Sequence, residues 1–356
     1  MVLHVGPVPS HNVAPKELWF TRCPVPTATG LAYNLGWLQD EFLRDGVTIR
    51  TLQESGTQYG RHHYDHRLPT LIREGGNILA IAARAQGEPT RLVGLTWIEE
   101  SQVILVRDNA EISSPSDLKG KRLALPAWGD HDLPSHARGT SIARGMSLHG
   151  YKGILANAGL SFDDVDLVEI DGKVPDLASG LHDGVSGLDR MPALEALKRG
   201  DVDAVYSKGA PALESAREAG LIIGIQLDDI PDPRFRVNNG TPRPITVHQD
   251  LIDNHFEYLV RFLAVTLRAA DWATGHMAEF CEILQAETYA GSAAAIVDAY
   301  ARSTTISLHP TLDGQRLSLF EQQKKFLLLH GFLDADFSLG DWVDTRPLDA
   351  AYKLIS

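Results

Sequence analysis

The sequence predicts an α/β protein of two lobes with a helical C-terminal tail, and three observations support this fold class. Strand-like and helix-like segments alternate from residue 17 onward, which is the pattern of a parallel-rich sheet with helices on both faces. The chain has 356 residues, more than one hydrophobic core usually organises. After about residue 230 the apolar periodicity is largely helical.

The first lobe is expected to open with a strand over residues 17–23. A helix over 28–46, which stops at a glycine, and a second strand over 47–55 follow it. Residues 67–88 are predicted to form a turn and a helix. Two further strands, "TRLVGLTWI" and "SQVILVRD", complete this part of the chain.

A second unit is expected to begin near residue 108, where serine and proline interrupt the pattern before the strand "KRLALP". A helix through "GILANAGL", a strand "VDLVEI" and a helix, turn and strand over 191–209 follow. We therefore expect lobe 2 to span residues 108–227, and lobe 1 to combine residues 1–107 with residues 228–356.

Composition and charge exclude several classes of protein. Hydrophobic residues make up 44% and charged residues 22%, as in ordinary globular proteins, and the formal net charge of −13 argues against nucleic-acid binding. No apolar run approaches the roughly 18–20 residues that span a bilayer, so no membrane partner is expected. The N-terminal segment lacks the pattern of a secretory signal, which predicts a cytoplasmic location, and we expect a monomer.

Two phrases in the second unit carry a resemblance to a known fold. "DLKGKRLAL" (117–125) and "LKRGDVDAVY" (197–206), in this order and at this separation, resemble type II periplasmic-binding-protein folds of the nitrate, sulfonate and taurine group. The tail "FLLLHGFLDADFSLGDWVDTRPL" is similar as well. The resemblance implies two α/β lobes joined by two crossing strands, with a ligand in the cleft between them.

Candidate catalytic side chains are grouped in the first lobe, where open α/β sheets bind ligands. Cys23 ends the first predicted strand, residues 61–67 hold three histidines, and Arg73 begins the sequence R-x-G-G. A thiolate is a strong nucleophile that a nearby cation favours, and histidine can supply that cation or a hydrogen bond. Arginine binds carboxylate, sulfinate or phosphate through two donors, and paired glycines let backbone N–H groups approach an oxyanion. Together these groups predict a site that breaks a bond at an oxyanionic centre.

The same residues resemble the 2′-hydroxybiphenyl-2-sulfinate desulfinase family. The resemblance rests on "CPVP" after the first strand, on a histidine ten residues before an arginine, and on R-x-G-G at that arginine. It places Cys23 at the catalytic cysteine, His63 at the catalytic histidine and Arg73 at the catalytic arginine. His62 is the alternative histidine, because the local alignment needs an insertion between Gly56 and His63.

The resemblance implies cleavage of a carbon–sulfur bond by water, which converts an aryl sulfinate into an arene and sulfite. It implies no metal and no organic cofactor, and a small anionic, aromatic substrate. Cys23 would attack the sulfur or protonate the carbon, and the sequence leaves both routes open. His63 would orient or activate the thiol, and Arg73 would bind the sulfinate. The predicted substrate-binding residues are Gly75 and Gly76, through their amides, with Pro24, Thr27, Thr140, Ser141 and Ser207.

The second lobe departs from the family pattern. Where the family's pocket is rich in tryptophan, this chain has "GTSIARG" (139–145) and "YSKGAPA" (206–212). Each lost aromatic contact removes roughly 1 kcal/mol of stacking. We therefore expect a substrate that is smaller or more polar than a biphenyl.

Other interpretations of these residues stay open. The fold also suits a solute-binding protein that delivers a sulfonate, nitrate or taurine-like ligand to an ABC transporter, although such a receptor is exported and needs no thiol in its cleft. A lyase or decarboxylase acting on an aromatic acid would use Arg73 in the same way. Cys23 alone is also compatible with a buried core residue, Arg73 with a solvated helix residue, and Gly75–Gly76 with a helix break.

Overall fold

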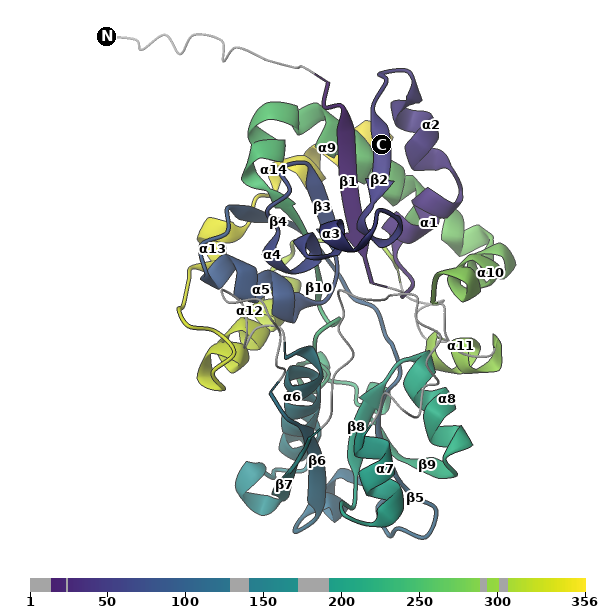
Figure 1. The fold of residues 1–356 in the computed structure, drawn as a ribbon, viewed down its shortest axis with the longest axis vertical. Coiled ribbons are helices and arrows are strands. Elements are labelled where there is room, and N and C mark those ends of the chain that lie inside the picture. The colour runs from purple at the N-terminus through teal and green to yellow at the C-terminus, as the bar shows by residue number, and fades with distance from the viewer. Residues whose placement is uncertain (1–13, 24, 129–140, 172–191, 289–292, 301–306) are drawn as a thin grey trace.

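Two α/β lobes stand one above the other in the computed structural model (Figure 1). The structure describes residues 14–356, except 24, 129–140, 172–191, 289–292 and 301–306. The predicted α/β fold class and the helical C-terminal tail are confirmed. The described part of the chain contains no helix that is both long and apolar enough to cross a membrane.

The upper lobe is organised around a five-stranded sheet with the order β2-β1-β3-β10-β4. Strand β1 is parallel to β2 and β3, whereas β10 is antiparallel to β3 and β4. The strands of this sheet are β1 (Glu17–Arg22), β2 (Thr48–Thr51), β3 (Leu71–Glu74), β4 (Thr90–Thr96) and β10 (Arg243–His248). The helices that the chain forms between or after these strands are α1 (Ala28–Asn34), α2 (Trp37–Leu43), α3 (Thr57–Gly60), α4 (His62–Asp65), α5 (Asn77–Ala85), α9 (Gln249–Gly275) and α14 (Arg346–Ile355).

The first helical segment is divided into two helices. A single helix over 28–46 was the expectation, but Gly36 adopts a positive φ of 77° and separates α1 from α2. This left-handed conformation is one that glycine adopts at little cost, so the chain turns there. Thr27 caps α1, because its hydroxyl accepts a hydrogen bond from the Gly30 amide at 3.0 Å.

Two strands of the upper sheet were not predicted from the sequence. Residues 67–88 were expected to hold only a turn and a helix, yet Leu71–Glu74 form strand β3 in the middle of the sheet. The segment after residue 230 was expected to be helical, yet Arg243–His248 form β10. Both strands carry buried charged residues, so neither shows the alternation of apolar and polar residues that marks a strand.

The lower lobe contains a sheet of order β8-β5-β9 and a parallel pair of strands, β6 and β7. Its strands are β5 (Gln102–Arg107), β6 (Arg122–Pro126), β7 (Asp166–Ile170), β8 (Val205–Lys208) and β9 (Leu221–Gln226), and its helices α6 (Ile142–Asn157), α7 (Pro192–Arg199) and α8 (Ala210–Glu218). Because β5 pairs with β8 and β9, it belongs to the lower lobe. The lobe boundary predicted at residue 107 therefore lies one strand too late, and the chain first crosses over residues 97–101.

The C-terminal helices touch both lobes. They are α10 (Met277–Thr288), α11 (Ala293–Tyr300), α12 (Gly314–Leu329) and α13 (Leu339–Trp342). Ile296 of α11 lies in one apolar cluster with Leu213 of α8, in the lower lobe. His149 of α6 stacks on Phe326 of α12, with ring centroids 4.0 Å apart. The tail therefore helps to hold the two lobes in one arrangement.

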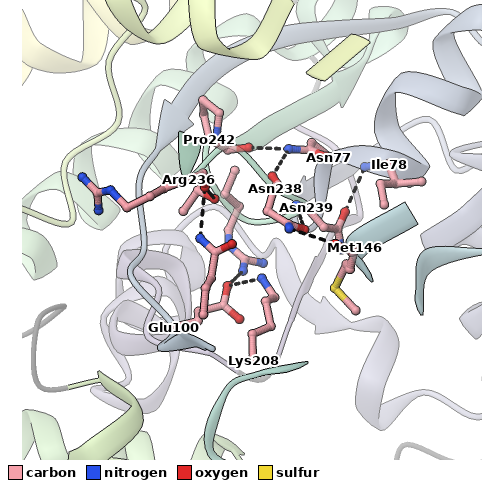
Figure 2. Close-up of polar contacts among 12 residues, drawn as sticks. Asn77, Ile78, Glu100, Met146, Lys208, Arg236, Asn238, Asn239 and Pro242 are labelled. Atoms are coloured by element: carbon pink, nitrogen blue, oxygen red, sulfur yellow. Dashed lines mark hydrogen bonds and ion pairs between the residues drawn. The ribbon is translucent and has the colours of Figure 1, made fainter. Parts of the chain in front are cut away.

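A hydrogen-bonded network, which we call the crossover network, joins the lobes where the chain returns over residues 227–242. The side-chain amide of Asn77 donates to the carbonyl oxygens of Asn238 and Pro242, at 2.6 and 2.9 Å. That of Asn238 donates to the carbonyl of Met146 on α6, at 3.0 Å (Figure 2). It also donates to the Tyr206 hydroxyl, at 2.9 Å. The upper-lobe helix α5 and the lower-lobe helix α6 are thus linked through one loop.

Candidate functional site

Cys23 lies at the edge of the upper sheet where the parallel strands β1 and β3 both end. Thr21 is paired with Arg73, and Arg22 with Glu74, so Cys23 comes next to Gly75 in the register. The carboxyl ends of parallel strands are the usual ligand-binding edge of an α/β sheet. The thiol is free and half-buried, and it packs against the apolar cluster that includes Tyr300.

Arg73 is fully buried beside this thiol. Its Nε donates to the carbonyl oxygen of His63 at 3.1 Å, and its Nη2 lies 3.4 Å from the His63 ring nitrogen Nε2. Its Nη1 is buried without a hydrogen-bond partner. Burial lowers the pKa of Arg73 to about 10 against the opposing effect of Cys23, so the guanidinium is charged at neutral pH. Among the described residues, no ion pair joins Arg73 to a carboxylate, which leaves its charge available to an anion.

His63 supports Arg73 rather than the thiol. Its Nδ1 lies 3.0 Å from the Thr21 hydroxyl, and Arg73 can only donate to its Nε2, so the ring proton belongs on Nδ1. Burial, and then Arg73, hold the pKa of His63 well below its usual value. A neutral His63 does not supply the cation that the sequence suggested for the thiol. His62 is turned to Asp65, with Nδ1 and Oδ1 2.9 Å apart, so of the two candidate histidines it is His63 that contacts Arg73.

Because Gly75 and Gly76 have no Cβ atom, they leave room for the side chains of Arg73 and Asn239. A Cβ atom on Gly75 would lie 2.8 Å from Cζ of Arg73, and one on Gly76 would collide with the side-chain amide of Asn239. The Gly75 amide donates to the carbonyl of Pro244 at 3.3 Å. This corrects the role predicted for that amide as an oxyanion donor, because its hydrogen bond is directed to the neighbouring strand β10.

Arg243 is a site residue that the sequence did not indicate. It is buried at the start of β10 and paired through Nη2 with Glu100, its Nε and Nη1 have no hydrogen-bond partner, and its charge interacts with Cys23. Although burial would raise the pKa of Glu100, Lys208 and Arg243 hold it below its usual value. Lys208 reaches the same Glu100 oxygen from the lower lobe, at 3.2 Å. No local sequence signal marks Arg243, because β10 follows β3 by about 170 residues in the chain.

Tyr300 of α11 completes the surroundings of the thiol. Its side chain is buried, and burial together with the nearby Glu100 raises its pKa well above the usual value. The nearby Cys23 also raises the pKa of Tyr300. The phenol therefore keeps its proton and can donate a hydrogen bond to an anionic group.

The remaining predicted substrate-binding residues are placed in different ways. The hydroxyl of Thr27 caps α1, and this buried residue thus has a structural function. Ser141 is buried directly before α6, and Ser207 is half-buried on β8, beside Lys208. Pro24 and Thr140 lie outside the described residues.

The chemistry of the site suits an anion. Arg73, Arg243 and Lys208 contribute three positive charges, and Glu100 contributes one negative charge. Burial raises the pKa of the neighbouring Glu74. No group of three or more histidine, cysteine, aspartate or glutamate side chains suitable for a metal ion occurs in the described part of the chain. The arrangement can hold an oxyanion against the sulfur of Cys23.

Comparisons with known proteins give the family of the chain and relatives of similar sequence. The model of the family described as NMT1/THI5 like matches residues 74–279. The chain is 29% identical over 347 residues to the 2′-hydroxybiphenyl-2-sulfinate desulfinase of Rhodococcus erythropolis, covering 91% of this chain and 90% of that protein.

Among solved structures, the chain is similar to a cysteine-to-serine mutant of the desulfinase DszB in complex with biphenyl-2-sulfinic acid. The two share 25% identity with a TM-score of 0.74, over 95% of this chain and 99% of that one. The periplasmic aliphatic sulphonate binding protein SsuA from Escherichia coli shares the fold, with 16% identity, a TM-score of 0.63, and 94% and 92% of the two chains covered. The type II periplasmic-binding-protein-like fold expected from the sequence is therefore confirmed.

Proposed function

The chain belongs to the NMT1/THI5-like family, and we propose that it is an enzyme that cleaves the carbon–sulfur bond of an aryl or related sulfinate and releases sulfite. One observation carries this proposal. A buried guanidinium with an unpaired Nη1, that of Arg73, lies beside a free thiol, that of Cys23, at the ligand-binding edge of the sheet. The similarity to a sulfinate desulfinase supports the choice of substrate.

Substrate binding follows from the unpaired donors. A sulfinate presents two oxygen atoms that share one negative charge, and a guanidinium binds such a group through two hydrogen bonds. Arg73 is held in place by His63, which fixes two of its three nitrogen atoms and leaves Nη1 for the ligand. The hydrogen bond from Nδ1 of His63 to Thr21 fixes the ring in turn.

The chemical step uses the sulfur of Cys23 in one of two balanced routes. In the first, the thiol gives its proton to the ring carbon while the carbon–sulfur bond breaks, and water converts the released sulfur dioxide into sulfite and restores the thiol proton. In the second, the thiolate attacks the sulfinate sulfur and the departing carbon takes a proton from water. The hydroxide so formed releases sulfite from the cysteine-bound intermediate and restores the thiolate. Positive charge from Arg73 and Arg243 favours the anionic sulfur groups in either route.

A second candidate, a receptor for an organic sulfonate, is favoured by the fold shared with SsuA. Such a receptor needs the cations of the site and has no use for a reactive thiol. The two candidates are distinguished by turnover, since a receptor would bind the anion and release no sulfite.

The test is sulfite release from a panel of aryl and alkyl sulfinates, measured for the unmodified protein, for Cys23→Ser and for Cys281→Ser. Cys281, on α10, is the other cysteine and the matched control. We expect Cys23→Ser to lose on the order of 10³-fold or more of the turnover while it still binds the sulfinate, and Cys281→Ser to retain activity. Equal sulfite release by Cys23→Ser, or none by the unmodified protein with any sulfinate, would contradict the proposal.

A further inference from the structure

We propose that Arg243 is a second anion-binding residue of the Cys23 site, so that the ligand is held between two guanidinium groups. The identity of that ligand as a sulfinate rests on the function proposed above. The placement of Arg243 rests on its own contacts, which the resemblance to desulfinases did not supply.

Arg243 has buried donors without acceptors. Only its Nη2 is used, in the pair with Glu100, whereas Nε and Nη1 are buried and have no partner. Buried polar groups in folded proteins are nearly always hydrogen-bonded, and a charged group left unpaired is especially costly. Two buried guanidinium nitrogen atoms without acceptors therefore indicate a ligand that supplies the acceptors.

Arg243 lies close to both Cys23 and Arg73, since its charge interacts with the thiol and with the Arg73 guanidinium. The two arginines stand on neighbouring antiparallel strands, β10 and β3. Two like charges buried close together repel, and an anion between them removes that repulsion.

Glu100 holds Arg243 in this position. One oxygen of Glu100 accepts from both Arg243 and Lys208, and Figure 2 shows the contact between Glu100 and Lys208. Gly240 permits this, because a Cβ atom there would collide with the Glu100 carboxylate and with Nη2 of Arg243. Glu100 is thus a positioning residue, and it also ties the lower-lobe strand β8 to the upper-lobe strand β10.

These contacts define the class of ligand. Three buried nitrogen atoms without hydrogen-bond partners, Nη1 of Arg73 and Nε and Nη1 of Arg243, belong to the two guanidinium groups near Cys23 and suit a ligand with at least two acceptor oxygens on one centre. A sulfinate anion meets this requirement. A neutral sulfone of the same shape lacks the charge that two guanidinium groups would balance, so the site should reject it.

The experiment measures binding of benzenesulfinate and of neutral methyl phenyl sulfone by calorimetry in a Cys23→Ser background. We expect Arg243→Met to weaken benzenesulfinate binding by about 30-fold or more and Arg243→Lys by about 10-fold, because lysine keeps the charge and loses the planar donor pair. Sulfone binding should be weak in every variant. Arg122→Lys, which changes an arginine paired with Asp203 in the lower lobe, is the matched control and should stay within twofold.

The outcomes separate this inference from the proposed function. If folded Arg243→Met binds benzenesulfinate within twofold of the Cys23→Ser parent, the inference about Arg243 is overturned. If Arg243→Met does not fold, the same result in Arg243→Lys overturns the inference. No binding of benzenesulfinate by the Cys23→Ser parent also overturns it. If binding falls as expected while the unmodified protein releases no sulfite, the anion site stands and the proposed function fails.

Discussion

Two buried polar clusters in the middle of the molecule differ in how completely they are hydrogen-bonded. In the crossover network, Asn77 uses both N–H groups, and its carbonyl accepts from Gln323 at 2.8 Å. In the anion site around Cys23, Arg73 and Arg243 each keep at least one buried N–H group without a partner.

The difference indicates what each cluster is for. A network in which the side-chain amides of Asn77 and Asn238 use all their donors and acceptors stabilises one arrangement of the chain and offers nothing to a ligand. A buried cluster with unpaired donors of one charge is incomplete without an acceptor from outside. The crossover network therefore positions the lobes, and the anion site binds.

The largest expected effect comes from removing a cation of the anion site. Arg73→Met should lower sulfite release by roughly 10²–10³-fold, the usual cost of losing one stabilising donor. The melting temperature should stay the same or rise, because a buried charge without an ionic partner is replaced by an apolar side chain. Steady-state kinetics and thermal unfolding check both parts. A large loss of stability would mean that Arg73 stabilises the fold, which would contradict the difference between the anion site and the crossover network.

The opposite pattern is expected in the crossover network. Asn77→Ala leaves two buried groups unpaired, the carbonyl of Pro242 and the side-chain amide of Gln323, and removes one of the two hydrogen bonds to the Asn238 carbonyl, so it should reduce the free energy of unfolding by about 2–3 kcal/mol. Turnover per folded molecule should change by only a few-fold. The control is Asn157→Ala at an exposed position near the end of α6, which should change stability by less than about 0.5 kcal/mol. Denaturant unfolding of both variants measures this.

A smaller effect is expected from crowding Arg73 without removing it. The Cβ of Gly75→Ala would come within 2.8 Å of Cζ of Arg73, so the guanidinium must shift. We expect turnover to fall by about 10-fold or more, since small displacements of positioning groups are costly to catalysis. Gly60→Ala, where a Cβ meets no atom within 4 Å, is the control and should leave turnover unchanged. Equal kinetics for the two variants would show that Gly75 does not serve Arg73.

The smallest effect concerns pH. Burial holds the pKa of His149, which stacks between the lobes, well below its usual value of 6.5, as it does for His63 in the anion site. The unfolded chain then binds more protons below about pH 6.5, so stability is present above this pH and is lost on acidification.

Each such histidine contributes a slope of up to about 1.4 kcal/mol per pH unit to the free energy of unfolding. His149→Phe keeps the stacking on Phe326 and should reduce the slope between pH 6.5 and 5 by up to that amount. Unfolding curves at several pH values provide the measurement, and an unchanged slope would contradict the assignment.

The sequence predicted the parts of the fold that local patterns encode. The strand before Cys23 and the helix–turn–strand over 191–209 lie where the periodicity placed them. Strands β3 and β10 were missed because their buried charged residues, Arg73, Glu74 and Arg243, hide the apolar pattern. These same residues form the site, so local rules failed where function places charge in the interior.

The site itself was predictable only in part. Cys23, His63 and Arg73 carry a recognisable spacing, and the structure brings Arg73 next to both of the others. Arg243 and Glu100 reach the site through strand pairing and a chain crossover between distant segments, which no short sequence pattern records. The hydrogen bond of the Gly75 amide depends on the same pairing with β10.

The central claim is that the unpaired guanidinium groups beside Cys23 hold a sulfinate, and a crystal structure of the Cys23→Ser variant with an aryl sulfinate tests it most directly. We predict sulfinate oxygens within about 2.7–3.2 Å of Nη1 of Arg73, and the sulfinate sulfur facing the side chain at position 23. A sulfinate bound elsewhere, or bound here with Nη1 of Arg73 still unpaired, would contradict the account.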